Sequence, residues 1–208
     1  MISCNSAAEF KELTNVSRET LAKLDAYAAL LVKWQQSINL VSNTTLDDLW
    51  RRHFLDSAQI APLITEYGPQ SPQCIDMGAG AGFPGLVLSA MGFGQWTLIE
   101  SDARKCVFLS EVVRQCEISA TVRAERVEGI KDLQADIVTA RAFAPLHRLL
   151  AYVEPLMKPT GLCIFPKGQR ADEELAAARA NWSFEVEEHQ SQTDEAAKIL
   201  VIQKVTRV

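Results

Sequence analysis

A glycine-rich turn at residues 75–85 constrains the fold of this chain more than any other feature. The turn reads IDMGAGAGFPG and lies between two short apolar runs. Glycine tolerates positive φ and lets the backbone approach a ligand closely. A strand that leads through such a turn into a helix is how α/β proteins hold nucleotide-like cofactors. The sequence therefore predicts an α/β fold with a cofactor site at this turn.

The turn matches two cofactor patterns. Read from Gly80 to Gly85 it is G-x-G-x-x-G, the dinucleotide fingerprint. Read from Asp76 it is D-x-G-x-G-x-G, which is typical of S-adenosylmethionine (SAM) enzymes. NAD brings a pyrophosphate, which an acid repels, whereas SAM brings an ammonium, which an acid attracts. Asp76 therefore favours SAM over an NAD-dependent oxidoreductase, and the predicted cofactor contacts in the turn are Asp76, Gly78, Ala79, Gly80, Gly82 and Phe83.

Two further strand ends extend the predicted cofactor site. Glu100 closes the apolar run 96–100, at a distance from the glycines where a carboxylate accepts hydrogen bonds from a ribose. The alternative role for Glu100 is as the neighbour of a helix N-cap. Ala124 and Glu125 follow the run 121–123, and the turn after this strand faces the adenine in SAM folds.

From residue 73 onward, short apolar runs alternate with helical stretches. This alternation predicts a mostly parallel sheet covered on both faces. The last two runs lack a helix-length connector, which indicates an antiparallel hairpin at or near one edge. A parallel sheet that ends in such a hairpin is typical of class I SAM-dependent methyltransferases. The predicted strands are 73–77, 96–100, 121–123, 136–140, 161–165, 184–187 and 199–205, and the predicted helices lie near 84–91, 103–116, 145–157 and 170–180.

The N-terminal part is predicted to be helical. A helix starting at Ser17 has an apolar stripe of Leu21, Leu24, Ala28, Leu31 and Val32. A second helix is predicted from Leu46 to about Ile60. The residues 67–72, YGPQSP, break helical structure and mark the boundary between the helical N-terminal part and the rest of the chain. We therefore expect an N-terminal helical extension over 1–66 and a SAM-binding domain over 73–208.

The composition bears on which partners the protein binds and in which compartment it acts. The net charge of −5 argues against a protein that coats nucleic acid by bulk electrostatics. The five cysteines are scattered without C-x-x-C spacing, so we expect neither a metal site nor a disulfide framework. No apolar run is long enough to span a membrane, and no secretory signal is visible. These features predict a cytoplasmic protein.

Several motifs together resemble the RsmG (GidB) family over roughly residues 30 to 175. The glycine turn alone indicates only a SAM enzyme, whereas its combination with H-x-L-D-S and R-A-F is more specific. The chain differs slightly from the family pattern at Arg104-Lys105, where many family members have two lysines. The motifs are Trp34, Asn39-Leu40, HFLDS at 53–57, FPG at 83–85, Glu100-Ser101, Lys105, Phe108-Leu109, RAE at 123–125, RAF at 141–143 and Lys167-Gly168.

The resemblance implies a class I methyltransferase fold and methyl transfer from SAM to N7 of a guanine in bacterial 16S ribosomal RNA. It also associates loss of the protein with low-level streptomycin resistance. Guanine N7 carries a lone pair and no proton, so the reaction needs positioning rather than a general base. In agreement, the chain lacks an [N/D]-P-P-[F/Y] tetrad and any Pro-Cys or Thr-Cys nucleophile pair.

Basic residues follow several strands at the edge where ligands bind in such sheets. Arg141 is predicted to position the guanine O6 or a phosphate and also to bind the cofactor, and Lys167 to bind a phosphate. Arg123 and Arg170 extend this basic rim toward RNA. Phe143 either stacks on the flipped base or packs under its loop.

His53 and Asp56 are one helical turn apart and are interpreted as a pair that docks the extension beside the cofactor loop, with a functional role as the alternative. The modest basic count favours a small-subunit particle as substrate, and nothing in the sequence demands more than a monomer. Beside the oxidoreductase, a non-catalytic RNA- or ribosome-binding protein with a SAM fold remains an alternative.

Overall fold

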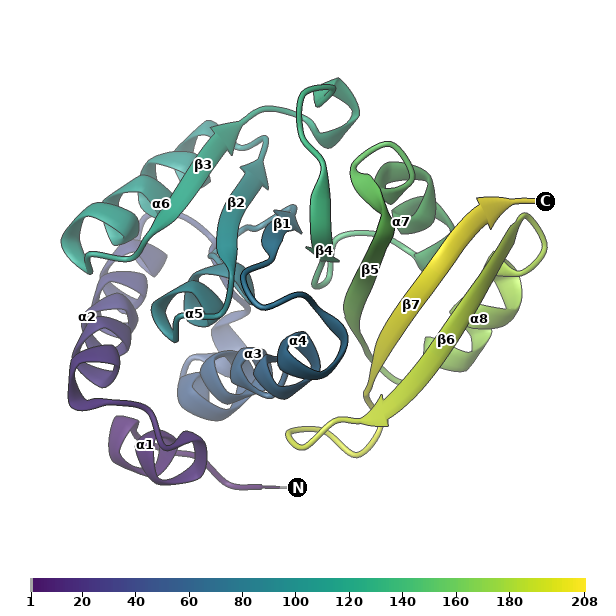
Figure 1. Cartoon of the computed structure of the whole chain (residues 1–208). Helices are drawn as coiled ribbons and strands as arrows, with labels where there is room; N and C mark the ends of the chain where they lie inside the picture. The colour runs from purple at the N-terminus through teal and green to yellow at the C-terminus, as the bar shows by residue number, and fades with distance from the viewer. Residues whose placement is uncertain (1) are drawn as a thin grey trace.

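The structure, a computed structural model that describes residues 2–208, is built around one seven-stranded sheet (Figure 1). The strand order is β3-β2-β1-β4-β5-β7-β6. Strands β1 to β5 pair in parallel, while β7 runs antiparallel to both β5 and β6. The predicted sheet with a terminal hairpin is therefore confirmed. The strands are β1 Gln73–Met77, β2 Gln95–Glu100, β3 Ala120–Ala124, β4 Ala135–Thr139, β5 Met157–Lys167, β6 Trp182–Gln190 and β7 Lys198–Arg207.

Helices cover both faces of the sheet, and the strands alternate between two hydrophobic clusters. In β5, Leu162 and Ile164 face the first cluster, while Cys163 and Phe165 face the second. This period of two is the pleat of a strand buried on both faces. The first cluster includes α5 Gly85–Ala90 and α6 Ala103–Gln115, and the second includes α7 Leu146–Val153 and α8 Ala171–Ala178.

The N-terminal segment begins with two helices, α1 Ala7–Thr14 and α2 Arg18–Gln35. Ser17 caps α2 by accepting a hydrogen bond from the backbone N–H of Thr20 at 3.0 Å, so the predicted helix start is confirmed. The predicted stripe was partly wrong, because Val32 is 48% exposed and Tyr27 is fully buried instead. The helix therefore packs through a face rotated toward Tyr27.

Residues 43–67 form several short turns and helices rather than the single helix predicted from Leu46 to Ile60. They comprise a 3₁₀ turn Asn43–Thr45, a π-helix Trp50–Leu55, α3 Asp56–Ala58 and α4 Ala61–Tyr67. The wide π turn is closed by a hydrogen bond from the Asp56 N–H to the Arg51 carbonyl oxygen. Pro62 lies in the first turn of α4, where its missing N–H is tolerated.

The helices of residues 7–67 pack against the first hydrophobic cluster. That cluster joins buried side chains of this segment, such as Leu24 and Phe54, to Leu86 and Phe108 of the sheet-covering helices. Figure 1 shows α2 beside α6 and α3 near α5, with α1 next to α2. The division into 1–66 and 73–208 stays a prediction.

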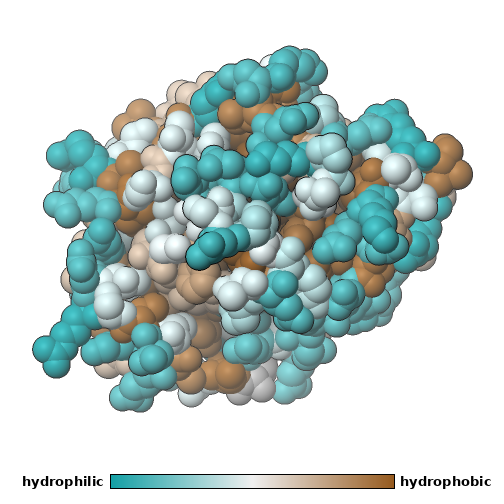
Figure 2. All heavy atoms as spheres, in the orientation of Figure 1, coloured by the Kyte–Doolittle hydropathy of each residue, from teal (hydrophilic) through white to brown (hydrophobic). Residues whose placement is uncertain are grey.

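Figure 2 shows the surface in the same orientation, with hydrophilic side chains spread over this face and small hydrophobic groups between them. Over residues 2–208, no helix combines the length and the apolar character needed to cross a bilayer.

Candidate functional site

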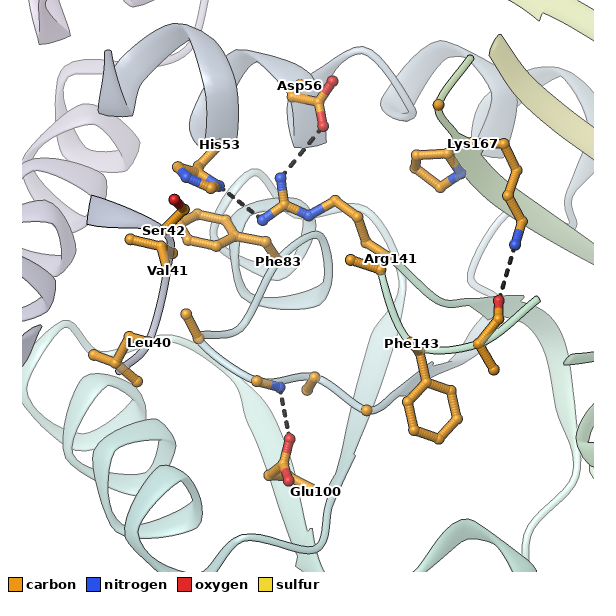
Figure 3. A pocket seen from close by; sticks show the side chains of 18 of the residues that line it. Leu40, Val41, Ser42, His53, Asp56, Phe83, Glu100, Arg141, Phe143 and Lys167 are labelled. Carbon is orange, nitrogen blue, oxygen red and sulfur yellow. Dashed lines mark hydrogen bonds and ion pairs between the residues drawn. The ribbon is translucent and has the colours of Figure 1, made fainter. Parts of the chain in front are cut away.

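A cavity of about 1370 Å³ lies at the carboxyl ends of the parallel strands (Figure 3). Open α/β sheets bind their ligands at this edge. Both ends of the chain contribute to its walls. The lining includes residues 78–81 and Phe83 of the glycine loop, residues 39–43, Glu100, residues 125–128, the loop 141–145, Lys167, and hairpin residues between 191 and 199. Gly82, predicted as a cofactor contact, does not line the cavity.

The glycine loop needs glycine at Gly78 and Gly82 for both backbone and space. Gly78 has φ of +65°, and a Cβ there would lie 2.3 Å from the Phe143 ring. Gly82 has φ of +96°, and a Cβ there would meet Leu86 and the Tyr27 hydroxyl. Any other residue would therefore strain the backbone and displace its neighbours.

Side chains of the N-terminal segment contact this loop and hold it in place. The Tyr27 hydroxyl donates a hydrogen bond to the Ala81 carbonyl oxygen, and its ring stacks on Phe83 with centroids 5.3 Å apart. Phe54 meets the same Phe83 ring edge-on at 5.3 Å. The loop is thus fixed by aromatic side chains that precede it in the chain.

Asp76 lies behind the glycine loop and does not line the cavity. One carboxylate oxygen accepts the Gly85 N–H at 3.0 Å, and the other accepts the Thr139 hydroxyl at 2.9 Å. Burial raises the pKa of Asp76 to about 6, against the lowering effect of these two hydrogen bonds. In this structure, Asp76 ties the loop to β4.

Glu100 does line the cavity, and its carboxylate organises two backbone segments. One oxygen accepts the Gly80 N–H at 2.9 Å, and the other accepts the N–H groups of Ser101 and Asp102. Asp102 in turn caps α6. Of the two residues predicted near an adenine, Glu125 lines the cavity and Ala124 does not.

Arg141 joins the loop after β4 to the N-terminal segment. Its Nη2 donates to His53 Nδ1 at 2.8 Å, and its Nη1 lies 3.1 Å from the Arg52 carbonyl oxygen and 3.4 Å from an Asp56 carboxylate oxygen. The guanidinium lies over the Phe83 ring, 5.0 Å from its centroid. Figure 3 shows Arg141 directed toward His53 and Asp56, above the glycine loop.

His53 is buried and uses both ring nitrogens. Nε2 lies 2.8 Å from the Thr45 hydroxyl, and the ring stacks on Phe83 at 5.1 Å. Burial, and then the positive charges of Arg141 and Arg52, lower the pKa of His53 to about 3. The imidazole is therefore neutral at physiological pH.

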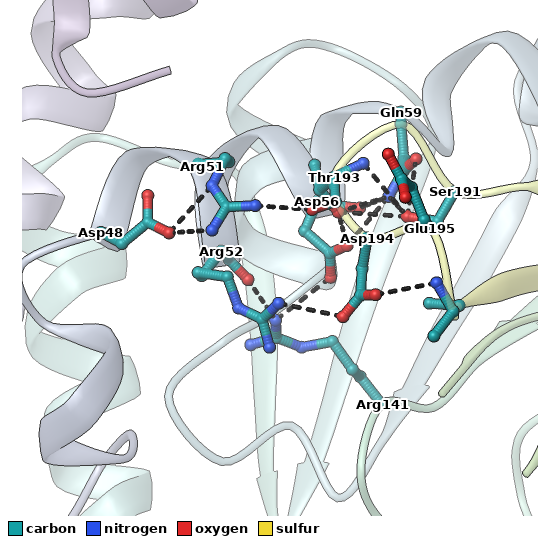
Figure 4. A network of polar contacts seen from close by, with 12 residues as sticks. Asp48, Arg51, Arg52, Asp56, Gln59, Arg141, Ser191, Thr193, Asp194 and Glu195 are labelled. Atoms are coloured by element: carbon teal, nitrogen blue, oxygen red, sulfur yellow. Dashed lines mark hydrogen bonds and ion pairs between the residues drawn. The ribbon is translucent and has the colours of Figure 1, made fainter. Parts of the chain in front are cut away.

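The loop between β6 and β7 closes one side of the cavity through a polar network with the N-terminal segment (Figure 4). Asp56 accepts a hydrogen bond from the Thr193 hydroxyl at 2.6 Å. Gln59 accepts the Gln192 N–H at 2.8 Å. Arg52 pairs with Asp194 at 3.1 Å. His53 and Asp56 thus link the N-terminal segment to Arg141, while Asp56 also holds the hairpin through Thr193.

The cavity brings together only some of the residues predicted to contact RNA. Arg141, Phe143 and Lys167 line it, and Lys167 is paired with Glu174 at 2.9 Å. Phe143 is 39% exposed and lies against Gly78, with its ring 5.8 Å from that of Tyr152. The ring therefore both covers the loop and faces the cavity.

Arg123 and Arg170 lie outside the cavity lining. Arg123 pairs with Glu125 and Asp132, and Arg170 pairs with Glu173 on the surface. Four further cations line the cavity, although the sequence analysis assigned them no role in the site. Their only sequence signal was a place in a small basic cluster or next to a predicted strand. These are Arg52, Lys105, Arg126 and Lys198.

Comparison with known proteins identifies close relatives. The family model described as rRNA small subunit methyltransferase G (GidB) matches residues 20–201. A relative named ribosomal RNA small subunit methyltransferase G from Rhodospirillum centenum is 47% identical over 199 residues, covering 96% of this chain and 91% of the relative. One of the same name from Gluconobacter oxydans is 46% identical, with 94% and 100% covered.

Solved structures share the fold at low identity. A mutant of MtNAS in complex with S-adenosylmethionine has a TM-score of 0.61 at 12% identity, with 96% of this chain and 84% of the other covered. The ribosomal protein L11 methylase from Lactobacillus delbrueckii subsp. bulgaricus has a TM-score of 0.55 at 16% identity, with 73% and 78% covered. The predicted class I methyltransferase fold is confirmed.

Proposed function

This chain belongs to the rRNA small subunit methyltransferase G family, and we propose that it transfers the methyl group of SAM to N7 of a guanine in bacterial 16S ribosomal RNA. The observation that carries this function is one continuous cavity with two kinds of lining. One part holds the glycine loop, Glu100 and Arg141, whose guanidinium lies over Phe83, and the other holds Phe143 and Lys167. Cofactor and base can thus meet within one enclosure.

The lining fits SAM. Glu100 has further acceptor capacity for a ribose beyond its backbone hydrogen bonds. The loop from Gly78 to Gly80 offers a close backbone surface, and Glu125 and Val127 lie where an adenine is expected. We assign Asp76 the role of holding Gly85 and Thr139, so that it acts on the cofactor through the loop.

The substrate side of the cavity is proposed to position the guanine, and the reaction needs no side chain that acts as a general base. SAM supplies an electrophilic methyl group, and the guanine N7 lone pair needs no deprotonation. Phe143 offers a ring on which a flipped guanine stacks. Lys167 steadies the loop after β4 through the Ala144 carbonyl oxygen and is proposed to face a phosphate on RNA binding. Arg123 and Arg170, outside the cavity, are proposed to contact more distant phosphates.

The substrate is proposed to be an assembled or partly assembled small subunit, and the protein to act on it as a monomer in the cytoplasm, without a metal ion. The formal net charge of −5 supports this, since a protein with an excess of acidic residues gains specificity from the shape of a particle more than from bulk attraction to RNA.

Methylation of purified components tests the function. The full-length protein is incubated with SAM and either naked 16S RNA or small subunits from cells that lack the gene, and nucleosides are analysed by mass spectrometry. We expect one 7-methylguanosine, formed faster on the particle. SAM binding without methylation of either substrate would favour the non-catalytic alternative, and NADH binding in place of SAM would favour the oxidoreductase.

A further inference from the structure

The Arg141 guanidinium has one edge engaged and one edge open. Both Nη atoms have partners in the N-terminal segment, namely His53, the Arg52 carbonyl oxygen and Asp56. A guanidinium has five N–H donors, and these contacts use three of them. Among the residues that the structure describes, no acceptor is bound to Nε or to the second hydrogen of Nη2. These two donors lie on the same edge of the planar group.

The hydrogen-bond chain around His53 fixes its tautomer. The Thr45 hydroxyl donates to the Ser42 carbonyl oxygen at 2.7 Å, so it must accept from His53 Nε2. Nε2 therefore carries the proton, and Nδ1 is left with the lone pair that accepts from Arg141. A protonated imidazole would place an N–H against the guanidinium, and the low pKa of His53 is consistent with its exclusion.

The Phe83 ring supports both partners. His53 stacks on it with an interplanar angle of 26°, and the Arg141 guanidinium lies over the same ring. Since Phe83 belongs to the glycine loop, Arg141 is held directly against this loop. Under the proposed function the ribose lies at Glu100, which binds the Gly80 N–H, so the amino-acid end of SAM is assigned to the remainder of the loop, beside Arg141. Asp76 is enclosed behind this loop, with both carboxylate oxygens engaged.

A paired donor edge matches a carboxylate better than it matches guanine. Arginine binds carboxylates through two parallel N–H···O bonds. At guanine the same fork would span O6 and N7, and a donor on N7 would occupy the lone pair that attacks the methyl group. Of the other cavity cations, Lys167 pairs with Glu174, Arg52 with Asp194 and Lys198 with Glu188. Lys105 and Arg126 follow β2 and β3, at the end of the site proposed for the ribose and adenine.

Resting on the proposed function, we propose that His53 is a positioning residue that aims the open edge of Arg141 at the carboxylate of the amino-acid end of SAM. In this role His53 acts through Arg141 and needs no contact of its own with cofactor or RNA. Its neutral Nδ1 selects one orientation of the guanidinium before the cofactor arrives, which reduces the entropy lost on binding.

Two ligands and two substitutions test this role. The full-length protein is titrated by calorimetry with SAM and with decarboxylated SAM, which lacks only the carboxylate. Asn places its oxygen where His53 has Nδ1, whereas Gln reaches only the Nε2 position. We expect His53→Gln to raise the SAM dissociation constant about tenfold and to change that of decarboxylated SAM by less than about twofold. His53→Asn should remain within about threefold of the wild type for both ligands.

The ratio of the two dissociation constants keeps the test valid if a variant folds poorly, because inactive protein changes the fitted stoichiometry rather than this ratio. Arg141→Lys keeps the charge but loses the fork, so it should reduce the wild-type preference for SAM. Equal weakening of both ligands by His53→Gln, or no weakening of SAM, would overturn the proposal. Wild-type protein that binds neither ligand would instead overturn the proposed function.

Discussion

The Tyr27 hydroxyl in α2 donates its hydrogen to the Ala81 carbonyl oxygen in the glycine loop, 54 residues further along the chain. Both residues are buried in the hydrophobic cluster that joins the N-terminal segment to the sheet-covering helices. Burial raises the pKa of Tyr27 well above its ordinary value, so the hydroxyl remains a donor at all physiological pH values. The loop conformation is therefore coupled to the packing of α2.

Tyr27→Phe should destabilise the protein and loosen the loop. The substitution leaves the Ala81 carbonyl oxygen without its partner, which costs about 1–3 kcal/mol for a buried acceptor. Chemical denaturation measures this loss, and SAM affinity should fall several-fold. Tyr67→Phe is the matched control, because its hydroxyl binds Glu187 at the surface. Equal effects of the two substitutions would contradict the coupling.

Gly78→Ala should abolish tight SAM binding, because the new Cβ would overlap the Phe143 ring and the backbone would keep its positive φ. Gly129→Ala is the control, since a Cβ there meets nothing within 4 Å. Calorimetric titration with SAM separates the two variants. Adding Phe143→Ala to Gly78→Ala should restore part of the affinity, because it removes the overlap but not the backbone strain. No gain in the double variant would argue against the overlap.

Asp76→Asn should make stability less dependent on pH. The native pKa of about 6 exceeds the ordinary value of 3.8, so the folded protein binds this proton more tightly than the unfolded chain does. Asp76 therefore lowers the free energy of unfolding as pH rises from about 4 to 6, by roughly 3 kcal/mol in total. Asn retains one acceptor and removes the charge.

Unfolding free energies measured from pH 4 to 7.5 check this sign. Relative to the wild type, Asp76→Asn should gain stability as pH rises to about 6 and then stay level. A gap between the two proteins that stays constant over the whole range would rule out the raised pKa.

Glu100→Gln should weaken SAM binding by at least about tenfold, because a neutral amide replaces a carboxylate that accepts three backbone N–H groups. Thermal unfolding should also begin at a lower temperature. Glu111→Gln, which removes an exposed carboxylate paired with Arg114 on α6, serves as control. A Glu100 variant that binds SAM normally would remove this residue from the cofactor site.

Most of the sheet could be predicted from the sequence, because its strands are buried on both faces and appear as short apolar runs. The short helix α1 and the π turn could not. Helix α1 fully buries only Phe10, so it gives little periodicity. A π turn shifts the helical period within six residues, so a rule based on 3.6 residues per turn misplaces the faces of Trp50–Leu55.

That the glycine loop and Glu100 lie in one cavity could also be predicted, because the glycines and the strand-terminal acid lie at fixed short spacings. The contacts of Arg141 were not predicted. His53 lies 88 residues from Arg141, and Arg51 lies 142 residues from Thr193, whose carbonyl oxygen it binds. Such pairs depend on how the extension and the hairpin are placed on the sheet, and no local pattern encodes that placement. For Asp76, the local pattern gave its place before the glycine loop but not the direction of its side chain, which is enclosed behind that loop.

The hairpin wall of the cavity has a consequence for how the protein is made. Translation produces the glycine loop and its N-terminal support well before Ser191, Asp194 and Lys198, which complete the enclosure. Strand β7 must then insert between β5 and β6 for that wall to form. We therefore expect a nascent chain to acquire a closed pocket only after β7 has been synthesised, so that chains that have not yet reached β7 would not sequester SAM.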